Sequence, residues 1–182
     1  MSKSTYIALL RGINIGAHKR VKMEALQQTM RELGFEDVRT YIQSGNMVFK
    51  AATADTGRLA DKIEKKLLSD FGFAVPVIVR TPSELHQVIQ KNSFLKEVGM
   101  DISRLHVTFL SGFPEKTVLK SLDAIPAGPD RFHCGGKEIY LHCPNSYSDT
   151  KFSNSGLEKA LSVQATTRNW KTVPKLYEMT LE

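Results

Sequence analysis

The feature that most constrains this sequence is an apolar segment that occurs twice. Tyr6–Leu10 runs directly into a polar stretch that ends at Gly16, and a related segment, His106–Leu110, is followed by Ser111 and Gly112. A short apolar run bounded by glycine-containing turns is typical of a buried strand. Since the two copies lie 100 positions apart, the sequence predicts two related halves, each built around one central strand.

The first half predicts a regular order of strands and helices. The expected elements are a strand over Thr5–Arg11, a helix over Met23–Gly34, strands over Asp37–Ile42 and Met47–Lys50, a helix over Asp55–Phe71 and a strand over Ala74–Arg80. This is the β-α-β-β-α-β order of ferredoxin-like domains. A trailing helix should follow, because Thr81, Pro82 and Glu84 form a capping box with proline in the first turn.

The second half predicts the same order. The expected elements are a strand over Arg104–Ser111, a helix near Lys116–Leu122, strands over Arg131–Cys134 and Glu138–Cys143, a helix from Ser155 to Leu161, a strand over Val163–Arg168 and a last helix ending near Leu181. Ser155 and Glu158 should form a second capping box. A turn at Gly135-Gly136 should pair Cys134 with Lys137.

These patterns together predict the fold class and the domains. The chain should be an α+β protein of two ferredoxin-like halves, each followed by a helix and related by internal duplication. We place the first half at residues 1–96 and the second at residues 97–182, with Leu95–Ile102 as the linker.

The net charge of +6 is unevenly distributed. Residues 6–22, 40–47, 150–157 and 164–173 contain no Asp or Glu, yet they hold seven of the 25 basic residues, namely Arg11, Lys19, Arg20, Lys22, Lys151, Arg168 and Lys171. The rest of the chain is near neutral, with 18 basic and 19 acidic residues. This partition indicates a local surface for an anion rather than a general basic coat.

Two polar loops of the first half are predicted to meet at one edge of its sheet. In a ferredoxin-like sheet the end of the first strand lies beside the hairpin between the second and third strands. Glycines let backbone N–H groups approach an anion, and arginine binds phosphate bidentately. The predicted ligand-binding residues here are Arg11, Gly12, Asn14, Gly16, Lys19, Ser44 and Asn46. The alternative is a tight crossover loop, with Arg11 paired to Glu36 or Asp37.

A second polar cluster is predicted in the second half. Residues that follow its third strand and end its fourth strand share one edge of the sheet, and the predicted ligand-binding residues among them are Lys151, Thr167, Arg168 and Asn169. Whether the two clusters share one cleft depends on how the halves pack, which the sequence leaves open. Trp170 should anchor the last helix in the core, with stacking on a ligand ring as the alternative.

Several common sites do not fit the spacing. Gly12 and Gly16 lack the spacing of a dinucleotide fingerprint, and Ala17-His18 stands where a P-loop requires lysine and a hydroxyl residue. Cys134 and Cys143 should lie too far apart along their hairpin to share a metal ion. We therefore expect no metal and no cofactor. Only five apolar residues precede Arg11, which predicts a cytoplasmic protein without a signal peptide or membrane partner.

Longer motifs run through nearly the whole chain. They are Leu10–Gly16, Met23 with Leu26, Gly34-Phe35 with Asp37-Val38, Thr40–Asn46, Ala165–Trp170 and Thr172-Val173. Together they resemble a bacterial family of uncharacterised proteins, domain-of-unknown-function family 1697 (DUF1697). The sequence departs from the family pattern at Ala17, where the family has a second glycine, and at Ser93, where it has a proline. The resemblance implies a two-part α+β fold of ferredoxin-like pieces and no established activity.

Three functions follow as hypotheses. The first is binding of an anionic ligand, either a nucleotide, a phosphorylated metabolite or nucleic acid, by the basic Gly/Asn/Ser loops. The second is phosphoryl hydrolysis similar to that of acylphosphatase, with Arg11 and Asn46 at the phosphate. In the third, Arg11, Asn46 and Arg168 only join the two halves. The identity of the ligand, catalysis and the oligomeric state do not follow from the sequence.

Overall fold

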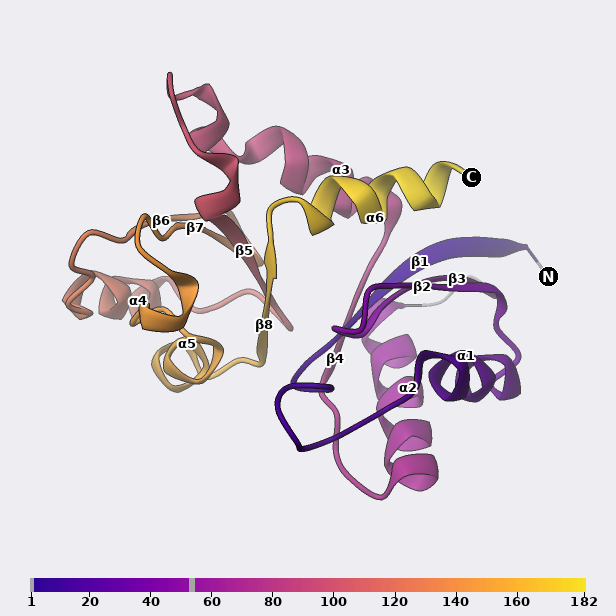
Figure 1. The fold of residues 1–182 in the computed structure, drawn as a ribbon. Helices are drawn as coiled ribbons and strands as arrows, with labels where there is room; N and C mark the ends of the chain where they lie inside the picture. The colour runs from indigo at the N-terminus through magenta and orange to yellow at the C-terminus, as the bar shows by residue number, and fades with distance from the viewer. Residues whose placement is uncertain (1, 53–54) are drawn as a thin grey trace. The chain divides into compact units, whose positions relative to one another are not determined.

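A computed structural model describes residues 2–52 and 55–182 of the chain. These residues form an α+β protein with two four-stranded antiparallel sheets (Figure 1). The strand order is β2-β3-β1-β4 in one sheet and β6-β7-β5-β8 in the other. The predicted fold class is confirmed, and so is the ferredoxin-like strand order in both halves.

The first half follows the predicted order of elements. They are β1 (Lys3–Leu10), α1 (Met23–Glu32), β2 (Glu36–Tyr41), β3 (Asn46–Ala52), α2 (Thr56–Phe71), β4 (Val77–Arg80) and α3 (Pro82–Lys91). The start of α3 is set by the predicted capping box. The Thr81 N–H donates to the Glu84 carboxylate over 2.8 Å, and the Glu84 N–H donates to the Thr81 hydroxyl over 3.2 Å.

The second half repeats that order with shorter helices. Its elements are the 3-10 helices η1 (Ser93–Lys96) and η2 (Ile102–Arg104), then β5 (Leu105–Leu110), α4 (Lys116–Leu119), η3 (Lys120–Ala124), β6 (Arg131–Cys134), β7 (Glu138–His142), η4 (Tyr147–Asp149), α5 (Asn154–Leu161), β8 (Ala165–Asn169) and α6 (Thr172–Leu181). The strands and the helices between them have the β-α-β-β-α-β order. The predicted duplication is therefore visible in the element order.

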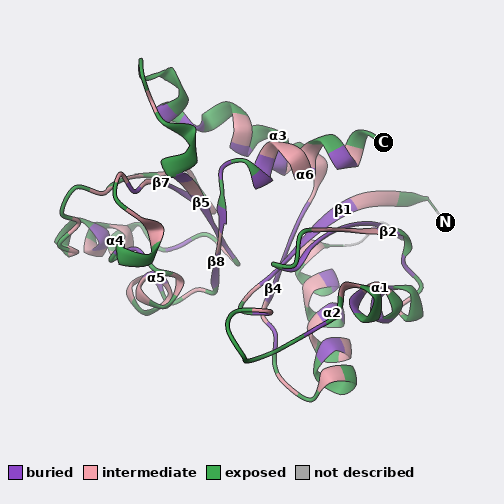
Figure 2. Cartoon of the chain, viewed as in Figure 1, coloured by how far each residue is buried: buried purple, intermediate pink, exposed green. Residues whose placement is uncertain are grey.

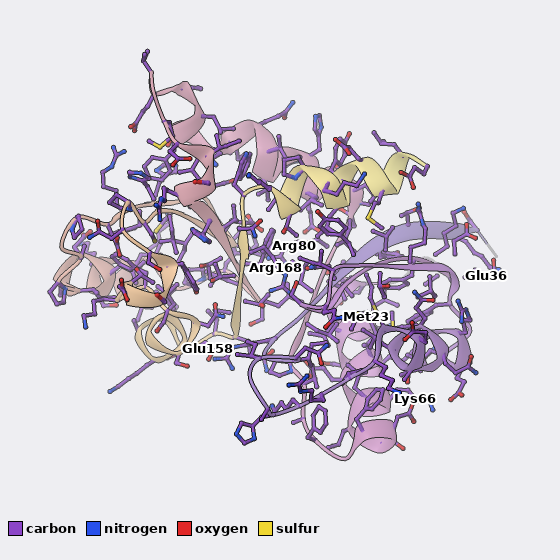
Figure 3. All side chains as sticks on the ribbon, in the orientation of Figure 1. Met23, Glu36, Lys66, Arg80, Glu158 and Arg168 are labelled. Atoms are coloured by element: carbon purple, nitrogen blue, oxygen red, sulfur yellow. The ribbon has the colours of Figure 1, made fainter. Side chains whose placement is uncertain are left out.

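The predicted cap of α5 is wrong. The helix is capped by Ser153, whose hydroxyl accepts a hydrogen bond from the Gly156 N–H. Glu158 (Figure 3) does not close a capping box with Ser155 but accepts a hydrogen bond from the Ala165 N–H over 2.9 Å. Both serines have the chemistry of a helix cap, so the local sequence does not choose between them.

The predicted turn between β6 and β7 is wrong by one position. The Gly135 N–H donates to the Glu138 carbonyl over 2.8 Å, so the two turn residues are Gly136 and Lys137. Cys134 consequently pairs with Ile139. Gly136 has φ +83°. Two-residue hairpin turns require a positive φ at their first central residue, and glycine adopts it readily.

The chain divides into two compact units. Met1–His86 and Leu176–Glu182 form the first, and Gln87–Lys175 form the second. The borders between the units fall within α3 and α6. The boundary placed between residues 96 and 97 from the sequence stays a prediction.

The core of the first unit lies between its sheet and two helices. Leu26 and Met30 of α1 and Ile63 and Leu67 of α2 pack on the strands, where Phe49 is fully buried. The last five residues of β1 are all buried, so both faces of this strand are covered (Figure 2). This explains why β1 has a continuous apolar run instead of the alternation of a half-exposed strand.

The core of the second unit is built in the same way. Leu157 and Leu161 of α5 pack with Leu141 of β7 and with Phe152, all of them buried. Trp170 is also buried, as predicted for a residue that anchors the last helix. Among the described residues, no helix has the length and apolar character needed to cross a bilayer.

Candidate functional site

The structure brings the two predicted loops of the first unit together. The loop of residues 11–22, between β1 and α1, lies beside the β2–β3 turn, because the Leu10 N–H donates to the Gly45 carbonyl over 2.9 Å. Gly45 has φ +80°, and a Cβ atom there would lie 2.7 Å from the Cβ of Leu10 and 2.9 Å from the Cδ1 of buried Ile13. Glycine is therefore required for this close approach.

Asn14 joins the two loops with its side chain. Its Nδ2 donates to the carbonyls of Val21 and Gln43, each over 2.9 Å, and its Oδ1 accepts from the Val21 N–H over 2.8 Å. Asn14 has φ +55°, a region that asparagine enters more readily than most residues. Both amide donors of Asn14 are used within the protein, and its contact with a ligand stays a prediction.

The loop itself folds into a short hairpin. The Asn14 N–H donates to the Lys19 carbonyl over 3.0 Å, and Ile15 and His18 form an isolated antiparallel bridge. Gly16, with φ +61°, lies in the turn between them. The Arg11 N–H donates to a carbonyl of the segment before β4 over 2.9 Å. The N–H groups of Leu10, Arg11 and Asn14 are thus engaged and do not form an anion nest.

Asn46 and Ser44 also bond to each other. Asn46 is fully buried, and its Nδ2 donates to the Tyr41 carbonyl over 3.1 Å and to the Ser44 hydroxyl over 2.8 Å. These bonds close the β2–β3 turn. Both amide donors of Asn46 are therefore directed into the turn, and its contact with a ligand stays a prediction.

The cations of the loop are placed differently from these amides. Lys19 donates from Nζ to the Ala74 carbonyl over 2.7 Å, and the same atom lies 5.9 Å from the centre of the Phe73 ring. Arg20 and Lys22 are exposed, and within residues 2–52 and 55–182 neither side chain has a hydrogen bond or an ion pair. The loop therefore presents two cations whose charge nothing in the described chain neutralises.

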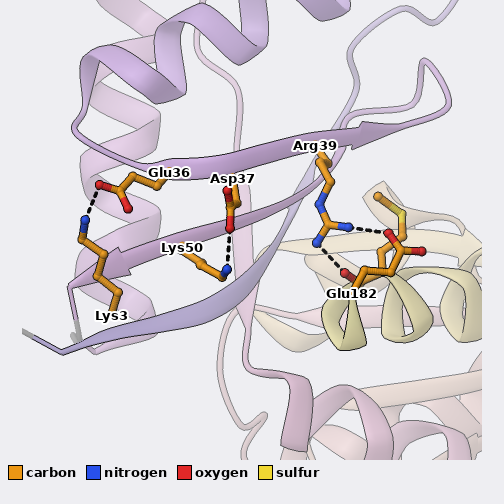
Figure 4. Close-up of polar contacts among 7 residues, drawn as sticks. Lys3, Glu36, Asp37, Arg39, Lys50 and Glu182 are labelled. Carbon is orange, nitrogen blue, oxygen red and sulfur yellow. Dashed lines mark hydrogen bonds and ion pairs between the residues drawn. The ribbon is translucent and has the colours of Figure 1, made fainter.

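Three other cations of the same unit meet carboxylates, whereas Arg58 and Lys65 of α2 are exposed without such a partner in the described chain. Lys3 pairs with Glu36 and Lys50 with Asp37, the two acids considered as partners of Arg11 (Figure 4). Arg39 pairs with Glu182 over 2.5 Å. A segment without acids, such as residues 6–22, cannot supply such partners from its own sequence. The anion-binding surface expected from the uneven charge of the sequence stays a prediction.

The polar residues predicted in the second unit make internal bonds. The Thr167 hydroxyl lies 2.7 Å from the Thr108 hydroxyl and donates to the Asn154 side-chain oxygen over 2.7 Å. The Asn169 side-chain oxygen accepts from the N–H and the hydroxyl of Thr172, over 3.0 and 2.9 Å, and so caps the start of α6. Lys151 is exposed on the loop that precedes α5.

Arg168 is a buried cation, and Arg80 occupies the equivalent position in the first unit. The sequence predictions did not include Arg80. The Arg168 Nη1 donates to the Thr166 hydroxyl and the Thr167 carbonyl over 2.8 and 2.9 Å, and burial lowers the pKa of Arg168 to about 10. Arg168 lies opposite Val107 in its sheet, as Arg80 lies opposite Ile7. Both arginines, labelled in Figure 3, are at most 7% exposed. Aligning Tyr6–Leu10 with His106–Leu110 through the strand pairing would have found Arg80.

Other titratable groups of the second unit are perturbed by burial. His106 stacks on Tyr147 with ring centres 4.8 Å apart, and burial lowers the pKa of its imidazole. Burial raises the pKa of the Cys143 thiol to about 11 and also raises that of Cys134. No group of three or more His, Cys, Asp or Glu side chains in the described part of the chain is arranged to hold a metal ion.

Hollows of the surface lie away from these residues. Three of them, with volumes of about 740, 390 and 410 Å³, are lined by none of the predicted ligand-binding residues. The first lies beside β6 in the second unit, and the third lies along β2 in the first. None of these three hollows includes a residue of the basic loop.

Comparison with known proteins agrees with the fold. The solved structure of the conserved bacterial protein SP0830 from Streptococcus pneumoniae is similar to this chain, with a TM-score of 0.79, 24% sequence identity, and coverage of 98% of this chain and 99% of that one. At this identity the likeness shows the fold alone. A search of curated proteins finds no match. A family model described as "Protein of unknown function (DUF1697)" matches residues 3–140, so the chain belongs to the DUF1697 family.

Proposed function

We propose that the chain binds an anionic, phosphate-bearing ligand through the basic loop of residues 11–22. The observation that carries the proposal is the exposure of Arg20 and Lys22, without carboxylate partners among the described residues, on a segment that contains no acid. Opposite charge is the strongest recognition that such a surface offers.

The internal bonds of the loop support this proposal. Asn14 holds the loop at both Val21 and Gln43. A loop that already has one conformation loses little conformational entropy when a ligand binds. Asn14, Ser44 and Asn46 would then contribute by positioning the cations, and the direct contacts would come from Arg20, Lys22 and the remaining donors of Lys19.

The class of ligand follows from the chemistry of the cations. Arginine presents a planar fork of donors that matches phosphate, and lysine adds a compact charge. A nucleotide, a phosphorylated metabolite and nucleic acid all carry the required group. Contacts with Lys151, Thr167, Arg168 and Asn169 are a separate proposal, because the last three already bond within their own unit.

The internal bonds of the polar side chains favour a structural role within each unit, whereas Arg20 and Lys22 make no such bonds among the described residues. Asn14, Asn46, Thr167 and Asn169 all have partners inside the protein. The hydrolase alternative needs the Asn46 amide at the phosphate, and both of its donors are used in the β2–β3 turn. Hydrolysis of benzoyl phosphate that is lost in Asn46→Ala, with the fold retained, would favour the hydrolase over binding alone.

Calorimetric titration with inorganic pyrophosphate, ATP and a short nucleic-acid duplex tests the proposal. The variant Arg20→Gln/Lys22→Gln should bind the best probe roughly thirtyfold more weakly, from about 1 kcal/mol for each lost contact. The matched control is Arg58→Gln/Lys65→Gln, which removes one arginine and one lysine that are exposed on α2. Equal losses in the two variants, or no binding of any probe by the wild type, would contradict the proposal.

A further inference from the structure

We infer that the ligand of the basic loop is double-stranded nucleic acid, with Ile15 and Ile42 in contact with its groove. This inference rests on the proposed function and narrows it to one class of phosphate-bearing partner. Two observations carry it: the three cations within four consecutive positions of an acid-free loop, and two exposed isoleucines on the two loops that Asn14 joins.

The cations lie close together in the sequence. Lys19, Arg20 and Lys22 fall within four consecutive positions, which span at most about 11 Å when extended at ~3.6 Å per residue. A single small phosphate is usually held by donors that converge on it. Here the amide donors that do converge, on Asn14 and Asn46, are used inside the protein. Several neighbouring cations without converging amide donors suit the repeated phosphates of a polymer.

Two exposed isoleucines lie on the loops that Asn14 joins. Ile15 is 70% exposed and Ile42 is 50% exposed. Their loops are held together, because Ile15 follows Asn14, Ile42 precedes Gln43, and the Asn14 Nδ2 donates to the Gln43 carbonyl over 2.9 Å. Both side chains leave apolar area in contact with solvent that a partner can cover.

The backbone of Ile42 strengthens the argument. Its φ is +50°, a conformation that β-branched residues rarely adopt and that costs on the order of 1–3 kcal/mol. The fold thus keeps an exposed apolar side chain in a backbone conformation that costs free energy. Isoleucine is among the apolar side chains that proteins insert at base steps from the minor groove, with lysine and arginine alongside.

An anionic bilayer is the other partner that cations and apolar side chains recognise together. Binding to a bilayer surface grows with the apolar area that is buried, and two isoleucines offer little. Binding to a duplex depends mainly on phosphate contacts, so two apolar side chains suffice as groove contacts. The observations therefore favour the duplex.

Fluorescence anisotropy of a labelled duplex over a series of salt concentrations tests the inference. The logarithm of the binding constant falls with the logarithm of salt by about 0.9 for each phosphate contact. We expect Arg20→Gln/Lys22→Gln to reduce that slope by about 1.8, and Arg58→Gln/Lys65→Gln to leave it unchanged. Ile15→Ser/Ile42→Ser should weaken binding about tenfold without changing the slope, because apolar contacts release no counterions.

Leu68→Ser, at an exposed position of α2, is the control for the isoleucines and should not affect binding. An unchanged slope in Arg20→Gln/Lys22→Gln, or wild-type affinity in Ile15→Ser/Ile42→Ser, would overturn the inference. If pyrophosphate or ATP binds and the duplex does not, the inference fails and the proposed function stands. If no phosphate probe binds, both fail. Binding to phosphatidylserine vesicles without duplex binding would replace nucleic acid with a membrane surface.

Discussion

Replacing Asn14 tests the central structural claim, which is that this side chain fixes the basic loop instead of contacting a ligand. Asn14→Ala removes three hydrogen bonds, two that Nδ2 donates and one that Oδ1 accepts. It also places alanine at φ +55°. The change therefore combines lost bonding with backbone strain, and the two parts can be separated by a second variant.

The magnitude follows from these two parts. Three bonds at a net ~1 kcal/mol each would contribute about 3 kcal/mol, reduced where water replaces a partner in this half-buried loop. The left-handed backbone costs alanine about 1–2 kcal/mol, a penalty that glycine does not have. We expect Asn14→Ala to lower the free energy of unfolding by about 2–4 kcal/mol, and Asn14→Gly by about 1 kcal/mol less.

Urea denaturation followed by circular dichroism measures this loss. A suitable control is Asn145→Ala, because Asn145 is exposed and its side chain has no hydrogen bond among the described residues. This control should change stability by less than about 0.5 kcal/mol. A loss below about 1 kcal/mol in Asn14→Ala, or one equal to that of the control, would refute the positioning role. Weaker binding of phosphate probes by folded Asn14→Gly would connect the loop conformation to the proposed function.

Three further changes test separate parts of the structure. The Asp55 side chain caps α2 by accepting hydrogen bonds from the Gly57 and Arg58 N–H groups. Asp55→Ala should therefore lower the free energy of unfolding by about 1 kcal/mol in thermal unfolding. An unchanged midpoint temperature would rule out this role of the cap. Burial raises the pKa of the Cys143 thiol to about 11 in the folded chain. The free energy of unfolding should therefore be fully present below the pKa that this thiol has in the unfolded chain, and it should fall as pH rises through the folded value. Urea titrations should show that Cys143→Ala loses this pH dependence. Burial lowers the pKa of the His106 imidazole in the folded chain. The free energy of unfolding should therefore fall as pH decreases through that folded pKa, and His106→Phe should flatten the decline. Equal slopes of unfolding free energy against pH in the wild type and the variant would contradict this prediction.

Local signals were sufficient for most of the fold. The capping box at Thr81 and Glu84 and the helical spacing in α2 depend on residues within a few positions of each other, and both elements begin as expected. The strand order then followed from the general rules of the ferredoxin-like arrangement. The errors came where two neighbouring residues had equal local chemistry. Ser153 rather than Ser155 caps α5, and the turn after β6 begins one residue later than expected.

The candidate site was harder to predict because polar side chains in loops have two uses. A pattern such as the one around Asn14 and Asn46 marks polar groups, but it does not say whether they face a ligand or each other. The partner of each polar group depends on which donor and acceptor atoms come within about 3 Å of each other, because hydrogen bonds weaken steeply beyond that distance. The structure shows that both amides bond internally, while Arg20 and Lys22 are exposed.

The sequence by itself determined the two β-α-β-β-α-β halves and the confinement of excess positive charge to segments without acids, because both are properties of consecutive residues. Only the tertiary structure decided that Asn14 bonds to Gln43, 29 positions away, and that Arg80 and Arg168 hold equivalent buried positions. These depend on how separate segments pair, because pairing places residues that are distant in sequence at fixed separations.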